Sequence, residues 1–231
     1  MSQDDHLPQH VGLILDGNRR WARKHGMSRL EGHRHGYDTL KTIAKHAHKK
    51  GIKYLSAYLF STENWNRSST ETTYLMKLLH RIISSEIDEL IGENGRIIWV
   101  GSRDGLSGTI LRDIEKAEKQ TQHNTGGTLI LCLNHGGHRE IAEAVQRIID
   151  AGLEAGDVND FTVGKYLDHP EIPLVDLIIR TSGEQRLSNF MLWRAAYSEL
   201  IFRDELWPDF TQRIFDECLV EYSKRQRRFG G

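Results

Sequence analysis

Two segments of the chain combine arginines with glycine and polar side chains, a combination suited to binding phosphate groups. The first is Asp16-Gly-Asn-Arg-Arg-Trp21, which is followed by Arg29 and His33. The second is Arg180-Thr-Ser-Gly-Glu-Gln-Arg-Leu-Ser-Asn189. Guanidinium groups bind several phosphate oxygens at once, and glycine lets backbone N–H groups approach an anion. Because the chain contains two such segments, the sequence predicts two anion sites and therefore two phosphorylated substrates.

Each segment also has a purely structural interpretation. Asp16 could cap a helix whose arginines are exposed to solvent, and the second segment could be a rigid loop after a buried strand. The sequence contains neither GxxxxGK[ST] nor GxGxxG, which excludes a P-loop and a dinucleotide-binding fingerprint. Both interpretations stay open when each segment is taken alone.

A magnesium ion would suit the first segment. Asp16 could be a ligand, because Mg²⁺ bridges carboxylate and phosphate oxygens and keeps most of its waters. Glu199, in Ala196-Tyr-Ser-Glu199, could supply a second oxygen or could be an exposed acid on an edge strand. The twelve histidines do not predict zinc, since no pair with helical ligand spacing has a third ligand nearby.

A third segment, Ser61-Thr-Glu-Asn-Trp-Asn-Arg67, places an aromatic ring among polar groups. Trp65 offers an apolar plane between Asn64 and Arg67, as an isoprenoid-like substrate with a charged head would require. A tryptophan that caps the core of a sheet gives the same pattern, so this alternative also stays open.

Short apolar runs that precede these segments predict buried strands, and longer amphipathic stretches between them predict helices. The predicted strands are Val11–Leu15, Tyr54–Phe60, Arg96–Val100, Thr128–Leu133, Val175–Ile179 and Glu199–Phe202, and the predicted helices include 75–91, 107–120, 139–151, 161–167 and 211–227. This alternation predicts one α/β domain with a mostly parallel sheet flanked by helices. Ligands of such sheets bind beyond the carboxyl ends of the strands, where the three segments lie.

Composition narrows the class of protein. The 231 residues include 38% hydrophobic residues, enough for a core, so a disordered chain is excluded. Lys and Arg number 31 against 32 for Asp and Glu, so no global charge attracts nucleic acid or anionic lipid. The sequence has no apolar run of about 20 residues and no signal-peptide pattern. Cys132 and Cys218 form no CxxC motif and are expected to be reduced, which favours the cytoplasm.

Taken together, these segments resemble the cis-prenyltransferases, the undecaprenyl diphosphate synthase family. The resemblance runs in order through residues 10–21, 61–67, 180–190, 196–200 and 227–231, nearly the whole chain. It implies a single catalytic domain over residues 1–231, flexible at 1–9, with an apolar tunnel beside a six-stranded sheet. It also implies a homodimer that uses Mg²⁺ to join prenyl diphosphates, with no nucleic acid partner and no stable membrane insertion.

The resemblance also implies roles for residues at matching positions. Asp16 would be the essential acid that handles the metal and the departing diphosphate, and Glu199 would be a metal ligand. Asn64 matches the residue assigned to proton removal; because an amide is a weak base, we expect the diphosphate or Ser61 to relay the proton. The allylic diphosphate site would be Gly17, Asn18, Arg19, Arg20, Trp21, Arg29 and His33, the second diphosphate site Arg180, Arg186, Leu187 and Ser188, and the surroundings of the reacting carbons Ser61, Thr62, Glu63, Trp65 and Arg67.

Two positions resemble the short-chain members of the family. Leu59 stands where long-chain members usually have a small residue, and Arg19 where they usually have glycine. A leucine at this place would project into the tunnel and stop growth early. The sequence therefore predicts condensation of dimethylallyl or geranyl diphosphate with isopentenyl diphosphate to a C10–C15 product.

Two departures from the family pattern keep an alternative reaction open. Asn134-His-Gly-Gly-His138 replaces the usual N-Y-G-G-R, and Gln185 stands where many long-chain members have histidine. Some relatives join two allylic diphosphates head to middle and make branched, lavandulyl-type products in secondary metabolism. A non-catalytic partner subunit would lack Asp16 and the first arginines, and an RNA-binding module would show a basic surface and an aromatic RNP pattern.

Overall fold

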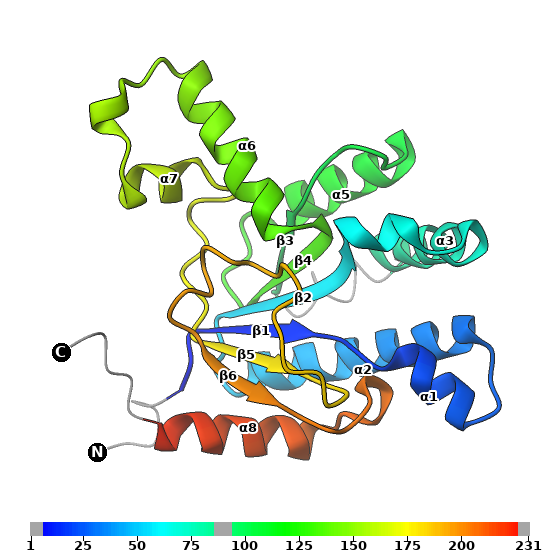
Figure 1. Ribbon diagram of the computed structural model, residues 1–231. Helices are drawn as coiled ribbons and strands as arrows, with labels where there is room; N and C mark the ends of the chain where they lie inside the picture. The colour runs from blue at the N-terminus through cyan, green and yellow to red at the C-terminus, as the bar shows by residue number, and fades with distance from the viewer. Residues whose placement is uncertain (1–6, 86–93, 226–231) are drawn as a thin grey trace.

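Six parallel strands form one sheet in the order β3-β4-β2-β1-β5-β6, as the computed structural model shows (Figure 1). The structure describes residues 7–85 and 94–225. The strands are β1 His10–Ile14, β2 Tyr54–Ser61, β3 Arg96–Val100, β4 Thr128–His135, β5 Leu177–Arg180 and β6 Glu199–Phe202. The predicted parallel, six-stranded α/β architecture is confirmed.

Helices follow the strands as the amphipathic stretches predict. They are α1 Asn18–Lys24, α2 Arg29–Lys49, α3 Ser69–Ser85, α5 Gly108–Thr121, α6 Gly137–Asp150, α7 Asp160–Tyr166 and α8 Gln212–Lys224, with short 3₁₀ turns η2 Thr62–Asn66, η3 Ala155–Asp157 and η4 Trp207–Asp209. A capping box starts α2, since the Ser28 hydroxyl accepts from the Glu31 N–H and the Glu31 carboxylate accepts from the Ser28 N–H. The predicted helices at 75–91 and 211–227 extend into segments that lie outside the described residues, and residues 227–231 of the family resemblance also lie outside them.

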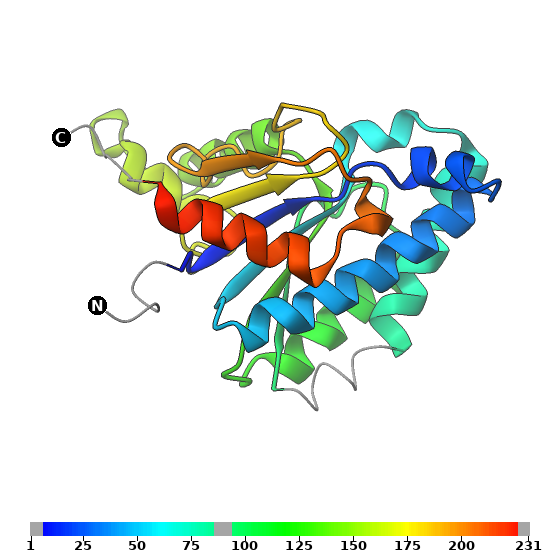
Figure 2. The ribbon, with the colours of Figure 1, turned by 90° about the horizontal axis from the view of Figure 1, so that it is seen from below.

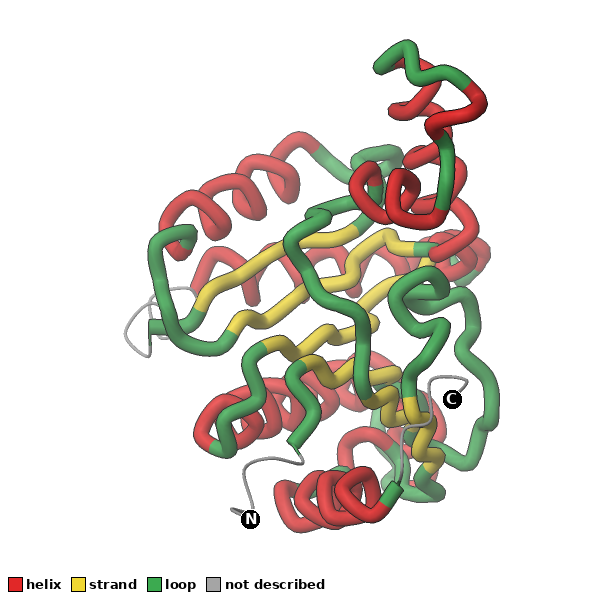
Figure 3. The backbone as a smooth tube through the Cα atoms, turned by 90° about the vertical axis from the view of Figure 1, so that its left-hand side faces the viewer, coloured by secondary structure: helices red, strands yellow, loops and turns green. Residues whose placement is uncertain are grey.

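Apolar side chains of the sheet pack on two sides. On one side, α2 and α8 cover β1, β2, β5 and β6, and α3 and α5 cover β3 and β4; Figure 2 views α2 and α8 across this side. On the other side, Phe190, Met191 and Ala195, from the long connection between β5 and β6, pack against the sheet. Figure 3 shows helices around the twisted sheet and loop segments running across the strands. This irregular connection leads directly from the second arginine segment.

β3 is an edge strand of the sheet, and side chains of α5 cover the edge that has no neighbouring strand. The N–H of Ile97 donates to the Thr121 hydroxyl at 3.0 Å, and the N–H of Trp99 donates to the Glu118 carboxylate at 2.9 Å. Edge strands otherwise present unpaired N–H groups to other chains. These two bonds satisfy donors that have no neighbouring strand.

The strand ends differ from expectation in detail. Of residues 1–9, which were expected to be flexible, 1–6 lie outside the described part, and Gln9 donates its N–H to Asp176 at 2.8 Å and accepts from the Tyr54 N–H at 3.0 Å. The strands β2, β4 and β5 extend to Ser61, His135 and Arg180, so residues expected on loops belong to strand ends. Among the described helices, none has the length and apolar character needed to cross a bilayer.

Candidate active site

Asp16 is the point at which the two arginine segments meet. It follows β1, and one of its carboxylate oxygens lies 2.9 Å from Arg180 Nη2 while the other lies 3.5 Å from Arg20 Nη2. Its carbonyl oxygen accepts from the Thr181 hydroxyl at 2.6 Å and from the Trp207 N–H at 3.0 Å. Residues 164 positions apart in the sequence are therefore brought together because β1 and β5 are adjacent and parallel.

Two glycines allow the chain to turn sharply after Asp16. Gly17 has φ of 113°, and a Cβ there would lie 3.0 Å from the backbone of Leu206, so only glycine fits without strain. Gly36, on α2, faces Asn18; a Cβ at Gly36 would lie 2.1 Å from the Asn18 amide oxygen. This close approach places the start of α1, with its arginines, directly against α2.

A polar cavity of about 690 Å³ lies over α1 and the start of α2. We call it the polar cavity throughout. Its lining consists of Leu15, Asp16, Gly17, Asn18, Arg19, Arg20, Arg23, Met27, Ser28, Arg29, His33 and Arg67. Five arginines thus face one carboxylate. This charge balance suits an anion with several negative charges, such as a diphosphate.

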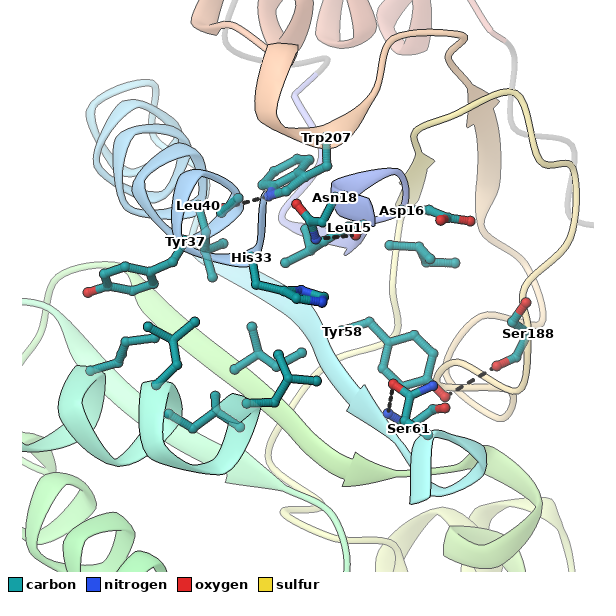
Figure 4. Close-up of a pocket in the computed structure, with 18 of the residues that line it drawn as sticks. Leu15, Asp16, Asn18, His33, Tyr37, Leu40, Tyr58, Ser61, Ser188 and Trp207 are labelled. Carbon is teal, nitrogen blue, oxygen red and sulfur yellow. Dashed lines mark hydrogen bonds between the residues drawn. The ribbon is translucent and has the colours of Figure 1, made fainter. Parts of the chain in front are cut away.

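An apolar cavity of about 240 Å³ adjoins the polar one (Figure 4). Its walls come from strand ends, α2, α3 and η4, and they include Ile14, Tyr37, Leu40, Tyr58, Leu59, Leu75, Leu78, Leu79, Ile82 and Trp207. Leu15, Asp16, Asn18, His33 and Arg67 line both cavities. The arrangement is a charged head site that opens into an apolar tail site.

Arg180 organises the second arginine segment from the end of β5. The side chain is 4% exposed, and its Nη1 donates to the Ser188 hydroxyl at 2.7 Å and to the Arg186 carbonyl at 2.5 Å. Its buried Nε has no protein partner. Arg180 and Ser188 both line the apolar cavity, and neither lines the polar cavity.

A layer of rings supports the loop that carries Ser188. Ser188, Asn189 and Met191 have positive φ angles, a backbone conformation that side chains disfavour. The Tyr58 hydroxyl lies 3.2 Å from the carbonyl oxygens of both Ser188 and His135, and the Tyr58 ring stacks on Phe190. His135 Nε2 accepts from the Met191 N–H at 3.1 Å.

Burial keeps two histidines of the sheet neutral, and this has a consequence for stability. Burial lowers the pKa of His135 to about 3 and that of His10 to about 4. In the unfolded chain both would titrate near 6.5, so below that pH the unfolded state binds more protons and stability falls as pH falls. Between pH 7.5 and 5 each histidine is expected to lower the free energy of unfolding by about 2 kcal/mol.

Urea titrations from pH 7.5 to 5 measure this loss, in a range above the ordinary pKa of the carboxylates. In the wild type, His10 and His135 together lower the free energy of unfolding as the pH falls. In His135→Gln this loss should be about half as large, because only one of the two buried imidazoles remains. An unchanged pH slope in His135→Gln would show that His135 is not the buried neutral group inferred here.

The third segment is divided between the site and its surroundings. Ser61, Asn64 and Arg67 line the apolar cavity, and the Asn64 amide oxygen accepts the Ser61 N–H at 3.2 Å. Trp65 lines neither cavity: its ring packs on Phe60 and its Nε1 donates to Asn134 at 2.7 Å. Trp65 is 37% exposed, so it is not a buried core residue, and both interpretations of it stay open.

Thr62 and Glu63 lie outside both cavities, and Glu63 contacts the second arginine segment. The Glu63 carboxylate accepts from the Asn189 amide at 2.9 Å, whereas the Thr62 hydroxyl lies beside Gly136, just before α6. The Glu63 contact joins η2 to the loop that carries Ser188. Glu63 therefore helps to position the site from outside it.

Three other predicted site residues also lie outside the cavities. Trp21 is buried and donates to Asp209 at 2.6 Å, which holds α1. Leu187 packs against the core on the loop side of the sheet. The Arg186 side chain is 59% exposed and pairs with Glu184 at 2.6 Å, so only its carbonyl contacts Arg180.

Glu199 is not brought near Asp16 within one chain. It is the first residue of β6 and is paired with Leu177, the first residue of β5, so it lies at the amino edge of the sheet. Its carboxylate lies 2.9 Å from Arg225 Nη1. Asp16 and Glu199 therefore lie apart within a single chain, and the metal ion that they were expected to share stays a prediction. Over residues 7–85 and 94–225 no cluster of three or more acidic, histidine or cysteine side chains could hold a metal.

Two polar residues at or beside the site were not predicted from the sequence. Tyr58 was counted only as part of a buried strand, although its hydroxyl reaches the Ser188 loop. Glu71, in the first turn of α3, contacts Arg67, four residues earlier in the chain, at 3.2 Å. The four-residue spacing of Arg67 and Glu71 was the only sequence signal for this contact.

Comparison with known proteins agrees with this geometry. The model of the family described as "Putative undecaprenyl diphosphate synthase" matches residues 14–230. An isoprenyl transferase of Thermotoga maritima is 46% identical over 228 residues, with 97% of each chain covered. A trans,polycis-polyprenyl diphosphate synthase ((2Z,6E)-farnesyl diphosphate specific) of Thermobifida fusca is 45% identical over 97% of this chain and 81% of its own.

A solved structure has nearly the same backbone. Lavandulyl diphosphate synthase from Lavandula x intermedia, in complex with dimethylallyl diphosphate, superposes with a TM-score of 0.95 at 34% identity, covering 99% of this chain and 100% of that chain. The fold and the paired cavities thus define a cis-prenyltransferase. The chain belongs to the undecaprenyl diphosphate synthase family.

Proposed function

We propose that this protein is a short-chain cis-prenyltransferase that joins dimethylallyl or geranyl diphosphate to isopentenyl diphosphate. The product would contain two or three isoprene units (C10–C15). The observation that carries the proposal is the contact of Asp16 with Arg20 on one side and Arg180 on the other, at the mouth of an apolar cavity. Two diphosphates bound to the two arginines would place their carbon chains side by side.

The residues of the site suit the chemistry of this coupling. When the allylic C–O bond breaks, negative charge develops on the departing diphosphate, and the guanidinium groups of the polar cavity are already in place to stabilise it. The allylic carbocation would lie among apolar walls such as Tyr58 and Leu59, which exclude water. The double bond of isopentenyl diphosphate attacks this carbon, a new C–C bond forms, and the proton lost from the adduct passes to the departed diphosphate or through Ser61.

Asp16 fits a magnesium ligand better than Glu199 does. Its carboxylate is about one-third exposed and faces the polar cavity, where diphosphate oxygens and water could complete the coordination of Mg²⁺. Mg²⁺ bound there would add positive charge against the departing diphosphate. The family resemblance that suggested Glu199 finds no support from the position of that residue in one chain.

The size of the apolar cavity supports a short product. Its volume of about 240 Å³ is below the roughly 300–1,000 Å³ of ordinary ligand pockets. Leu59 is one of its walls, with Leu75 and Leu79 of α3 nearby. A long polyprenyl chain would fit only if these three leucine side chains moved out of the cavity.

Replacing Leu59 by alanine is expected to lengthen the product by at least one isoprene unit, because it removes three carbon atoms from the cavity wall. Product mass, measured by mass spectrometry after dephosphorylation, tests this expectation. Leu111→Ala is a matched control, since Leu111 is a partly buried leucine outside the cavity lining. Equal product lengths for Leu59→Ala and the wild type would refute Leu59 as the stop.

Exposed apolar side chains on α6 and α7 support the expected homodimer. Val145, Ile149 and Phe161 are 43%, 63% and 69% exposed. The two helices lie together at one side of the molecule (Figure 1). A second copy of the chain could bury this surface.

Head-to-middle coupling of two allylic diphosphates is the second candidate reaction. It is favoured by the TM-score of 0.95 with a lavandulyl diphosphate synthase. A turnover assay with dimethylallyl diphosphate, with and without isopentenyl diphosphate, separates the two reactions. The main proposal expects a linear product only when isopentenyl diphosphate is present, whereas a branched product from dimethylallyl diphosphate alone would replace it with the second candidate.

A further inference from the structure

Glu71 is a buried carboxylate enclosed by positive groups. It lies in the first turn of α3 and is 4% exposed. Its Oε1 lies 3.2 Å from His33 Nε2, 3.2 Å from Arg67 Nη1 and 3.8 Å from Arg19 Nε, and its Oε2 lies 3.8 Å from Arg29 Nη1. Four side chains from three parts of the chain, α1, α2 and the segment after η2, thus converge on one carboxylate.

All four partners of Glu71 face the polar cavity, whereas Glu71 does not. Arg19, Arg29, His33 and Arg67 belong to the lining of that cavity. Glu71 therefore lies behind the groups that would bind a diphosphate. When the cavity holds no anion, Glu71 is the counter-ion of these groups.

The Glu71 carboxylate carries a negative charge in its role as counter-ion. Burial alone would raise the pKa of Glu71, but the hydrogen bond with His33 and the charges of Arg19 and Arg67 outweigh burial and hold the pKa below its ordinary value. The Nε2–H of His33 donates to this carboxylate, and burial lowers the pKa of His33.

The distances separate two kinds of contact. His33 and Arg67 are within hydrogen-bonding distance of Glu71, whereas Arg19 and Arg29 approach it at 3.8 Å without a hydrogen bond. The side chains of Arg19 and Arg29 are also 46% and 61% exposed. These two arginines are thus held by charge alone and can turn their N–H groups to a ligand.

We propose that Glu71 is a resident anion that competes with a bound diphosphate for these four groups and so promotes the departure of inorganic pyrophosphate after each coupling. The inference rests on the proposed function, because it takes the polar cavity to be the site of the leaving diphosphate. A site whose arginines had no internal counter-ion would hold this product more tightly. Tighter binding of a product slows turnover without aiding the chemical step.

The test compares two substitutions at Glu71: one removes the negative charge and keeps the length of the side chain, and the other keeps the charge and shortens the side chain. Glu71→Gln keeps the length and an acceptor oxygen but removes the charge, so we expect inorganic pyrophosphate to bind about tenfold more tightly and to dissociate more slowly. Glu71→Asp keeps the charge but shortens the side chain, so its affinity should stay within about twofold of the wild type. Isothermal titration calorimetry gives the dissociation constants, and stopped-flow displacement by dimethylallyl thiolodiphosphate gives the dissociation rates.

A control variant corrects for the change in net charge. Glu143→Gln makes the same change on α6, where Glu143 pairs with Arg139 away from the polar cavity, and it should bind pyrophosphate like the wild type. If Glu71→Gln folds only with an anion present, it can be purified with pyrophosphate bound, and its dissociation rate can be measured on dilution. In that measurement too, we expect pyrophosphate to dissociate more slowly from Glu71→Gln than from the wild type.

The outcomes distinguish this inference from the proposed function. Equal or weaker pyrophosphate binding by Glu71→Gln would mean that Glu71 only positions the arginines, and the inference would be wrong while the proposed function stood. If even the wild type bound neither pyrophosphate nor the allylic analogue, the proposed function itself would fail. A simple structural role predicts weaker binding in both Glu71 variants.

Discussion

Replacing Asp16 by asparagine is expected to lower kcat at least about a thousandfold, because one group at this position serves both halves of the site. The Asp16 carboxylate contacts Arg180 and Arg20 and is the proposed ligand of Mg²⁺. Asparagine keeps the shape and one acceptor oxygen but removes the charge. Steady-state release of pyrophosphate from dimethylallyl and isopentenyl diphosphates measures the effect.

Circular dichroism and thermal unfolding control for loss of structure in this variant. Asp209→Asn is a useful comparison, since Asp209 accepts a hydrogen bond from Trp21 near the same helix but lines neither cavity. We expect it to reduce stability more than turnover. Folded Asp16→Asn protein with kcat within about tenfold of the wild type would contradict the role of Asp16.

Arg180→Lys is expected to raise KM for isopentenyl diphosphate about a hundredfold and to change KM for the allylic substrate much less. The guanidinium holds Asp16, the Ser188 hydroxyl and the Arg186 carbonyl at the same time. Lysine is a point charge that cannot keep this planar set of contacts. Loss of two charge-assisted hydrogen bonds, each worth roughly 1.5–3 kcal/mol, is enough for an effect of this size.

Arg186→Lys is the matched control for this substitution. Its side chain is exposed and pairs with Glu184, so we expect an effect of no more than about tenfold on either KM. The ratio of the two KM values in each variant is the decisive quantity. If Arg180→Lys raised both KM values equally, Arg180 would support the whole site and would not define a second diphosphate site.

The strands could be predicted closely because parallel strands buried on both faces are continuous apolar runs. β1 illustrates this, since all five of its residues are buried. The ends of strands were harder to predict, because Ser61, His135 and Arg180 are polar and yet complete the ladders of β2, β4 and β5. In each case tertiary hydrogen bonds decide the boundary.

The convergence of the two arginine segments followed from the rule that carboxyl ends of parallel strands share one edge. Arg20 and Arg180 meet at Asp16 for this reason. The same rule, applied to Glu199, would have placed it at the other edge, because it stands at the start of its strand. The role of Glu199 as a metal ligand was implied by the family resemblance alone and not by the position of Glu199 in the sheet.

Glu71 could not be found by the same reasoning. Its partners come from α1, α2 and the segment after η2, and nothing in the sequence shows that these elements meet at the first turn of α3. Trp65 is a second example: its neighbours in the sequence suggested a substrate contact, but nothing in the sequence shows that its Nε1 donates to Asn134. Side-chain direction depends on packing that sequence patterns do not contain.

A crystal structure with dimethylallyl thiolodiphosphate and isopentenyl diphosphate bound together tests the central claim most directly. We expect one diphosphate among Arg19, Arg20 and Arg29, the other on Arg180 and Ser188, and both hydrocarbon chains directed toward the apolar cavity beside Asp16. Two ligands on separate surfaces, or a single diphosphate spanning both Arg20 and Arg180, would contradict the account.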